Sequence, residues 1–309
     1  MTDSPLPLLL AAEVREALAH RRPVVALEST IISHGLPRPR NLAVAQELEA
    51  LVRAGGAVPA TVAVLDGVAH VGLGKAELER IADDPAVRKL SFRDLAPALA
   101  TGASGATTVS ATAFLAARAG IRVFATGGLG GVHRGWATTL DESADLPLLA
   151  RTRITVVCAG VKSILDVPAT LERLETLGIT VLGYRTDSFP GFYLTSSGHP
   201  VDWTVTDPAE VVAVMRQQDR LGGLSSALLV TNPVPPEQQL DQALHDRVLA
   251  EALAAAEAAG ATGQAATPFL LGYLTEHTAG ASLEANLAAV RGNVRLGAEI
   301  ATAWAEHPA

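Results

Sequence analysis

Cysteine is nearly absent from this sequence, since Cys158 is the single one among 309 residues. No disulfide can therefore form within the chain, which fits a reducing compartment such as the cytoplasm. Cys158 lies inside an apolar run, and we expect it to be a small buried hydrophobe rather than a reactive thiol.

Aromatic residues are also scarce, at 4% of the sequence, although hydrophobic residues make up 49%. The core must therefore be built from Ala, Val, Leu and Ile, which suits helices packed on a mostly parallel sheet. Apolar runs are too short or too interrupted to span a bilayer, so we predict no membrane association. The leucines at 8–10 follow no basic segment, which argues against a signal peptide.

Positive charge is limited: Lys and Arg together number 24 against 32 Asp and Glu, and the formal net charge is −8. With a sequence pI near 5.5, no basic footprint is present, so binding of a nucleic-acid polymer is not expected. A single phosphate group can still be held by local N–H groups.

Predicted strands and helices alternate along the chain, which is the pattern of a doubly wound α/β fold. Neither a low-complexity linker nor a repeat of fixed period divides the sequence, so we predict one domain over residues 1–309. Strands are predicted over 24–27, 61–65, 68–71, 121–125, 154–159, 180–184 and 227–230. Helices are predicted over 8–22, 41–54, 75–82, 107–119, 145–150, 168–177, 208–218, 241–259 and 282–305, and 31–40 is predicted to be a loop.

Lysine occurs at only three positions, 75, 89 and 162. Lys162 follows a buried strand that ends near Gly160, at the kind of strand end where α/β proteins place their chemistry. A desolvated lysine amine can lose its proton and attack a carbonyl, whereas a guanidinium stays charged. Lys162 is therefore a candidate nucleophile, with a surface lysine on a strand-to-helix loop as the alternative interpretation.

Glu28 also follows a predicted buried strand, and Ser29 and Thr30 come directly after it. Burial raises the pKa of a carboxyl group, so Glu28 is a candidate general acid or base. An alternative interpretation is a structural glutamate that is hydrogen-bonded by the neighbouring hydroxyls.

Glycines are concentrated in the segment 126–135, which follows another predicted strand. Closely spaced glycines let the backbone approach a ligand and turn N–H groups towards an anion, and His133 and Arg134 add donors. His133 stands where a dinucleotide-binding loop requires its third glycine, so that class of site is not indicated. A plain mobile turn is an equally good interpretation of the loop.

Carboxylates are dense in the segment 141–145, which reads Asp141-Glu142-Ser143-Ala144-Asp145. Such a group of oxygen atoms can hold a hard divalent cation, but the same residues can instead cap the helix that follows.

Three further residues are candidates for contact with a phosphate or another internal partner. Lys89 and Arg93 flank Ser91 and can reach a phosphate, although simple solvation is the alternative. Asn286 lies in a predicted helix among small residues, and because asparagine has a poor helix propensity we expect it to have an internal partner.

An amine, a carboxylic acid, an anion-binding loop and a pair of carboxylates together suggest Schiff-base chemistry on a phosphorylated sugar. Common glycosidases use two carboxylates and need no lysine, so the combination points to a bond that is harder to cleave.

Six segments closely resemble those of the pseudouridine-5′-phosphate glycosidase family, also called the indigoidine synthase A family. They are Ala26–Gly35, Thr126–Gly135, Asp141–Leu146, Val157–Asp166, Asn232–Pro235 and Thr267–Leu271. The resemblance covers the chain from about residue 8 to residue 303, with the motifs in the same order.

This resemblance implies a homotrimeric enzyme with an α/β/α core, a pseudouridylate synthase or pseudouridine-5′-phosphate glycosidase. It implies reversible cleavage of pseudouridine 5′-phosphate to uracil and ribose 5-phosphate, with Mn²⁺ as the expected metal. Lys162 would form a Schiff base with C1′ of the opened ribose, Glu28 would donate a proton, and Asp141 would bind the metal. The implied substrate-binding residues are Lys89, Val109, Ser143, Ala144 and Asp145, with Thr126, Gly127, Gly128, His133 and Asn286 added by similarity and position.

Two alternatives to this function remain open at the level of sequence. A related C-glycoside synthase would join ribose 5-phosphate to an aromatic acceptor, because catalysis accelerates a reaction in both directions. A non-catalytic sugar-phosphate-binding protein is the second, although Glu28, Asp141 and Lys162 together argue against it. The segment 194–203 fits the family pattern poorly, so the sequence does not fix the identity of the base that departs.

Overall fold

A computed structural model describes residues 7–223, 225–261 and 266–306 of the chain. Within them, 11 strands form one sheet, in the order β1-β4-β3-β2-β7-β8-β11-β9-β10, and β5 and β6 are added beside β3. The strands are β1 (Leu8–Leu10), β2 (Val24–Leu27), β3 (Val58–Leu65), β4 (Val68–Val71), β5 (Arg88–Leu90), β6 (Gly105–Thr107), β7 (Val123–Ala125), β8 (Thr155–Cys158), β9 (Thr180–Tyr184), β10 (Trp203–Val205) and β11 (Leu228–Thr231).

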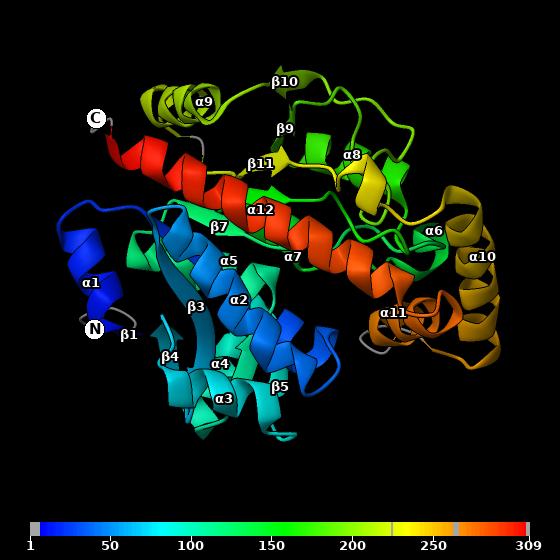
Figure 1. Cartoon of the computed structure of the whole chain (residues 1–309), viewed down its shortest axis with the longest axis horizontal. Helices are drawn as coiled ribbons and strands as arrows, with labels where there is room; N and C mark the ends of the chain where they lie inside the picture. The colour runs from blue at the N-terminus through cyan, green and yellow to red at the C-terminus, as the bar shows by residue number, and fades with distance from the viewer. Residues whose placement is uncertain (1–6, 224, 262–265, 307–309) are drawn as a thin grey trace.

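Helices cover both faces of this sheet (Figure 1). They are α1 (Ala12–Ala19), α2 (Arg40–Ala54), α3 (Lys75–Asp83), α4 (Leu95–Thr101), α5 (Val109–Ala119), α6 (Trp136–Thr139), α7 (Asp145–Leu149), α8 (Val167–Thr176), α9 (Pro208–Leu221), α10 (Gln242–Ala258), α11 (Ala266–His277) and α12 (Ala281–Glu306). Short π and 3₁₀ turns lie at η1 (Ile31–Gly35), η2 (Phe92–Asp94) and η3 (Pro236–Gln238).

The alternation of side chains along β2 explains how the sheet separates two cores. Val24 and Ala26 pack in a cluster with residues of α1 and α5, whereas Val25 and Leu27 pack in another with α2, α9 and α12. The long helix α12 crosses the second face and contacts β2, β7 and β8 (Figure 1). The predicted α/β fold around a mostly parallel sheet is therefore confirmed.

Parallel pairing brings four strand ends to one edge of the sheet. Strand β2 pairs in parallel with β7, β7 with β8, and β8 with β11. Glu28, Thr126, Ala159 and Asn232 directly follow these four strands, so residues far apart in the sequence meet at the carboxyl edge. In open α/β sheets this edge is where ligands bind.

Several element predictions are wrong in their boundaries or type. Leu8–Leu10, predicted as helix, is the strand β1, because it pairs in parallel with β4, a contact that no local pattern announces. The predicted loop 31–40 contains the π-helical turn η1, and the predicted helix 107–119 begins only at Val109. Strands β5, β6 and β10 and helices α4, α6 and α11 were not predicted.

Among the described residues, no helix combines the length and the apolar character that crossing a membrane requires. The prediction of one domain over 1–309 includes residues 1–6, 224, 262–265 and 307–309, which lie outside the described part, and it stays a prediction.

Candidate active site

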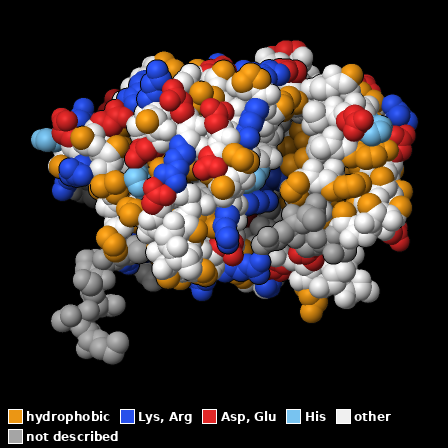
Figure 2. Space-filling model, turned by 90° about the horizontal axis from the view of Figure 1, so that it is seen from below, with side chains coloured by type: hydrophobic (Ala, Val, Ile, Leu, Met, Phe, Trp, Pro, Cys, Tyr) orange, Lys and Arg blue, Asp and Glu red, His pale blue; other side chains and the backbone are white. Residues whose placement is uncertain are grey.

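A cavity of about 450 Å³ lies at the carboxyl edge of the sheet. Seen from below, the molecule is hollowed between its main body and a lobe with many hydrophobic side chains (Figure 2). All but one of the residues predicted for the site line this cavity: Glu28, Lys89, Val109, Gly127, Gly128, His133, Asp141, Ser143, Ala144, Asp145, Lys162 and Asn286. The exception is Thr126, which is buried behind the wall.

Glu28 is half-buried, and its open side faces the cavity. The hydroxyl of Thr126 donates a short hydrogen bond to Glu28 Oε1, across two neighbouring strand ends. Thr126 therefore holds the carboxyl group and does not itself line the cavity, which differs from the predicted contact with substrate.

Burial raises the pKa of the Glu28 carboxyl above its ordinary value. The Lys162 ammonium and the Thr126 hydroxyl oppose this shift, and the Asp145 carboxylate adds to it. Because its pKa is raised, the carboxyl group keeps to a higher pH the proton that it can donate to a reacting carbon.

Lys162 is half-buried and projects into the same cavity from the loop after β8. Its Nζ donates to the carbonyl oxygen of Gly128 at 2.9 Å. The loop itself is fixed, since Lys162 N donates to the Leu129 carbonyl at 3.1 Å and Leu129 N to the Gly160 carbonyl at 2.9 Å. Lys162 does lie on a strand-to-helix loop, between β8 and α8, but its half-buried side chain lines the cavity rather than the open surface.

The glycine loop 126–135 directly follows β7, and several of its backbone amides are hydrogen-bonded within the protein. Its amides at Leu129, Gly130, Val132 and His133 all donate to protein acceptors. Glycine is needed at 128 because an added Cβ would lie 2.5 Å from the ring of Phe192. The loop thus shapes the cavity wall by close packing.

Asp145 is buried, with 6% of its surface exposed, and it connects two walls of the cavity. Its Oδ1 accepts from the amide of Ser110 in α5, and its Oδ2 accepts from the amide of Gly130, each at 2.9 Å. Ser143 Oγ accepts from the Asp145 amide at 3.2 Å. The alternative prediction, that Asp145 only caps a helix, is incomplete, because its carboxylate also holds the glycine loop against α5.

Lys89 and α5 form the cationic end of the cavity. Lys89 lies on β5, and partial burial together with the Lys162 charge lowers its pKa. The side chain of Val109 is 2% exposed and belongs to the core, so a ligand can meet this residue through its backbone. Val109 is the first residue of α5, where amide groups lack helical acceptors and attract anions.

The implied metal ligand, Asp141, is half-buried at the cavity rim beside His133. Asp141 Oδ2 lies 3.8 Å from His133 Nδ1, while the neighbouring Glu142 carboxylate is engaged by Arg173 at 2.9 Å. In the part of the chain that the structure describes, no three His, Cys, Asp or Glu residues form a metal cluster. The donor set therefore fits only a cation that keeps most of its water ligands.

Asn286 lies on α12, and its Oδ1 has no hydrogen-bond partner among the described residues. The expected internal partner is thus missing for this oxygen, which is itself shielded from solvent although the residue lines the cavity. Cys158 is fully buried, which raises the pKa of its thiol to about 12, as expected for an unreactive cysteine.

Some wall residues escaped prediction. Phe192, with a left-handed backbone at φ 67°, packs against the glycine loop, and nothing in its sequence pattern singles it out. Thr267, Pro268 and Leu271 of α11 also line the cavity, and their motif was the available signal.

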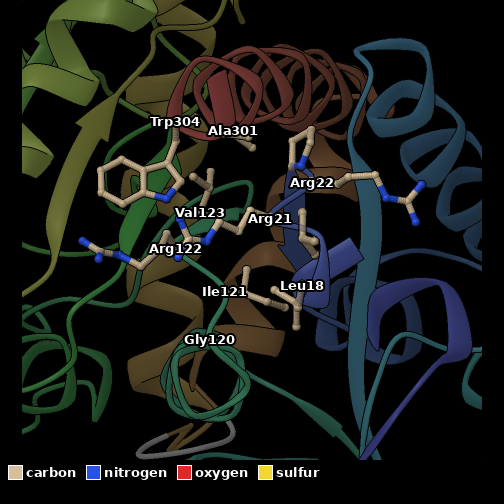
Figure 3. A pocket seen from close by; sticks show the side chains of 12 residues that line it. Leu18, Arg21, Arg22, Gly120, Ile121, Arg122, Val123, Ala301 and Trp304 are labelled. Carbon is tan, nitrogen blue, oxygen red and sulfur yellow. The ribbon is translucent and has the colours of Figure 1, made fainter. Parts of the chain in front are cut away.

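A second cavity of about 310 Å³ lies at the opposite edge, where β2 and β7 begin (Figure 3). Its Arg122 pairs with Asp219 at 2.9 Å and stacks 4.7 Å from the Trp304 ring. Neither Glu28 nor Lys162 reaches it, so the chemistry belongs to the first cavity.

The chain is similar to one family model and to several known proteins. The family model described as "Indigoidine synthase A like protein" matches residues 13–303. A pseudouridine-5′-phosphate glycosidase from Streptomyces griseus is 72% identical, covering 96% of this chain and 92% of the relative, and one from Frankia alni is 62% identical, covering 96% and 82%.

Two solved structures are similar over nearly the whole chain. The prealnumycin C-glycosynthase AlnA in complex with ribulose 5-phosphate has a TM-score of 0.90 and 38% identity, covering 97% of each chain. An indigoidine synthase A-like protein from Thermotoga maritima has a TM-score of 0.87 and 36% identity, covering 98% of each chain.

Proposed function

The chain belongs to the family of indigoidine synthase A-like proteins, and from this premise we propose that it is a pseudouridine-5′-phosphate glycosidase. It would reversibly cleave the carbon–carbon glycosidic bond of pseudouridine 5′-phosphate, giving uracil and ribose 5-phosphate. The shared name of relatives up to 72% identical supports this reaction. The structural observation that carries the proposal is the contact of both Lys162 and Glu28 with the segment 126–128.

Lys162 is the proposed nucleophile. Its neutral amine bonds to C1′ as the C1′–O4′ bond of the ribose opens, and the proton that the nitrogen then loses is taken up by O4′. The bond from C1′ to the base carbon then breaks, the nitrogen lone pair forms an imine with C1′, and the released electron pair stays on the base carbon. Glu28 delivers a proton to that carbon, and water hydrolyses the imine to free ribose 5-phosphate and the lysine amine.

The phosphate group would lie at the cationic end of the cavity. Lys89 supplies the charge, and the backbone amide of Val109 at the start of α5 is the proposed donor, since the next amide, that of Ser110, is already bonded to Asp145. This placement directs the opened sugar towards Lys162, while Asn286 lines the same cavity from α12 and is a candidate contact for the base.

A divalent cation, expected to be Mn²⁺, would be held by Asp141 and its bound waters near His133. When bound, such a cation supplies positive charge that stabilises substrate oxygens. Chelation with EDTA is expected to reduce turnover, and added Mn²⁺ to restore it. Asp141→Asn should weaken that restoration, whereas full activity in EDTA would contradict the metal site.

Trapping of the imine tests the nucleophile. Incubation with ribose 5-phosphate and borohydride should add one reduced sugar phosphate to the intact mass. Lys162→Ala should abolish the adduct, while Lys75→Ala, which removes an 82% exposed lysine, should keep it. An adduct that persists in Lys162→Ala would overturn the assignment.

A C-glycoside synthase is the second candidate, because AlnA, at 38% identity, carries the name of a C-glycosynthase. Uracil release from pseudouridine 5′-phosphate supports the first function. If no uracil is released, and if ribose 5-phosphate is consumed when an aromatic acceptor is added, the C-glycoside synthase function is supported.

We further propose a cytoplasmic homotrimer. The solution mass is then expected to be three times the 31.9 kDa of one chain, which light scattering measures directly.

A further inference from the structure

Asn293 is a fully buried polar residue in the middle of α12. Its Nδ2 donates to the carbonyl oxygens of Thr126, at 2.8 Å, and Gly127, at 3.2 Å. Its Oδ1 accepts from Asn232 Nδ2 at 3.1 Å. Both donor hydrogens and the acceptor oxygen of the amide are therefore engaged, in directions that leave little freedom to the side chain.

The partners of Asn293 follow two strands, β7 and β11, which lie on either side of β8. Thr126 follows β7, and its amide donates to the Val157 carbonyl of β8 at 3.0 Å. Asn232 follows β11, and its amide donates to the Cys158 carbonyl of β8 at 2.8 Å. Asn293 thus fastens the helix layer to the carboxyl edge of the sheet at the point where β7 stops.

A buried asparagine inside a helix is unfavourable unless its polar atoms are satisfied. Its neighbours Val290, Val294 and Gly297 pack against the sheet as apolar or small residues. An amide side chain is needed here because it donates hydrogen bonds to the two carbonyl groups that follow β7. Its bonds therefore serve the segment 126–128.

That segment touches both proposed catalytic residues. Thr126 Oγ1 donates to Glu28, and the Gly128 carbonyl accepts from Lys162 Nζ at 2.9 Å. A displacement of the backbone between them would move the carboxyl group and the amine relative to each other.

We propose that Asn293 is a positioning residue that fixes the segment 126–128 and, through it, the mutual placement of Glu28 and Lys162. This rests on the proposed function of those two residues. Asn293 does not line the cavity, so it acts on the reaction without touching substrate.

Asn293→Leu tests the proposal by removing all three hydrogen bonds while keeping the branched four-atom side chain. Its methyl groups are bulkier than the amide, and the control variant below carries the same increase in volume. A misplacement of about 1 Å in an active site can cost about 100-fold in rate. We therefore expect kcat for uracil release to fall between about 10-fold and 100-fold, with KM for pseudouridine 5′-phosphate within about threefold of wild type. The rate of borohydride trapping with ribose 5-phosphate should fall in parallel.

The pH profile provides a readout that a purely structural role would not move. The Thr126 bond lowers the pKa of Glu28, so loosening it should shift the alkaline limb of kcat to higher pH. The charged groups facing Glu28 are Lys162, Lys89 and Asp145, and all three stay unaltered in Asn293→Leu.

Asn41→Leu is the matched control. Asn41 is also fully buried in a helix, and its Nδ2 also donates to two carbonyls, those of Ile32 at 3.0 Å and Ala82 at 2.9 Å. It should lose stability to urea as Asn293→Leu does, but keep kcat within about threefold and leave the pH profile in place.

An Asn293→Leu enzyme with kcat and pH profile like the control would overturn the proposal. If Asn293→Leu does not fold, Asn232→Ala replaces it, because this variant removes only the side chain that orients the Asn293 amide. Asn232→Ala should lower kcat about tenfold. An unchanged kcat in that variant would also overturn the proposal. Absence of uracil release by the wild type is a separate failure, of the proposed reaction, and trapping with ribose 5-phosphate then becomes the readout for Asn293.

Discussion

The proposed reaction depends more on the protonation of the Glu28 carboxyl group than on that of any other side chain. Replacement by glutamine keeps the shape but removes the transferable proton, so Glu28→Gln should lower kcat for uracil release by about 10² to 10⁴. Imine formation with ribose 5-phosphate needs no proton on a base carbon, so borohydride trapping should persist. Loss of both activities together would contradict the assignment of Glu28 as proton donor to the base.

Glu49 offers a matched control for this variant. It too is half-buried, burial raises its pKa, and Thr61 donates to its Oε1 at 2.6 Å, yet it lies away from the cavity. Glu49→Gln should therefore keep kcat within about threefold of wild type.

Both glutamates also predict how stability depends on pH. Each folded pKa lies above the ordinary value of 4.5, so the folded chain binds these protons more tightly than the unfolded chain. The stability they contribute is present below pH 4.5 and is lost as pH rises through the folded pKa. Measured by urea unfolding, Glu28→Gln should gain stability relative to wild type as the pH rises above 4.5. A stability difference that stays constant as the pH rises would contradict the raised pKa.

At the scale of single elements, capping makes a prediction for α9 that is independent of the site. Asp207 precedes Pro208 and accepts from the Glu210 amide at 3.0 Å, which makes it the N-cap of this helix. Asp207→Ala should lower the free energy of unfolding by about 0.5–2 kcal/mol. Turnover should be unchanged, since no residue of α9 lines the cavity.

Asp202→Ala controls for charge in that experiment, because Asp202 is exposed and nearby. A loss of stability equal in the two variants would mean that charge, rather than capping, explains the effect.

The elements also mark where sequence reasoning succeeds. The strands β2, β8 and β11 are continuous apolar runs, so their ends, and with them Glu28 and Lys162, could be predicted from local pattern. By contrast, β1 and β10 have three residues each and exist through pairing with β4 and β9, which are distant in sequence. Helix α11 carries Pro268 and Gly272, which weaken a helical pattern.

The site residues show the same difference between what local sequence predicts and what only tertiary contacts determine. Asp145 was predicted as a cap, a metal ligand or a substrate contact, but its two acceptor bonds join Ser110 and Gly130, from elements that only the fold brings together. Thr126 was predicted to contact substrate, whereas it holds Glu28 from a neighbouring strand. Local sequence identifies which residues carry chemistry, and tertiary pairing decides which of them hold the others.

At the scale of the whole molecule, the cavity is built from residues as distant as Glu28 and Asn286, so a ligand should stabilise the entire fold. A ligand that binds only the folded chain adds about 2.7 kcal/mol at 100 times its Kd. For a chain of 309 residues this corresponds to a rise in Tm of roughly 5 °C. Ribose 5-phosphate should produce such a rise in a thermal melt, and ribose without phosphate should produce little.

Two variants separate the contributions to this shift. Lys89→Ala removes the charge at the phosphate end, so it should lose most of the rise in Tm at the same ribose 5-phosphate concentration. Lys162→Ala cannot form the imine but keeps Lys89 and the first turn of α5, so it should retain the non-covalent part. An equal rise with ribose and with ribose 5-phosphate would contradict the phosphate site, because recognition would then not depend on the charge that Lys89 supplies. An undiminished rise in Lys162→Ala would show that the covalent bond adds nothing to affinity, which places the energy of recognition in the phosphate contacts.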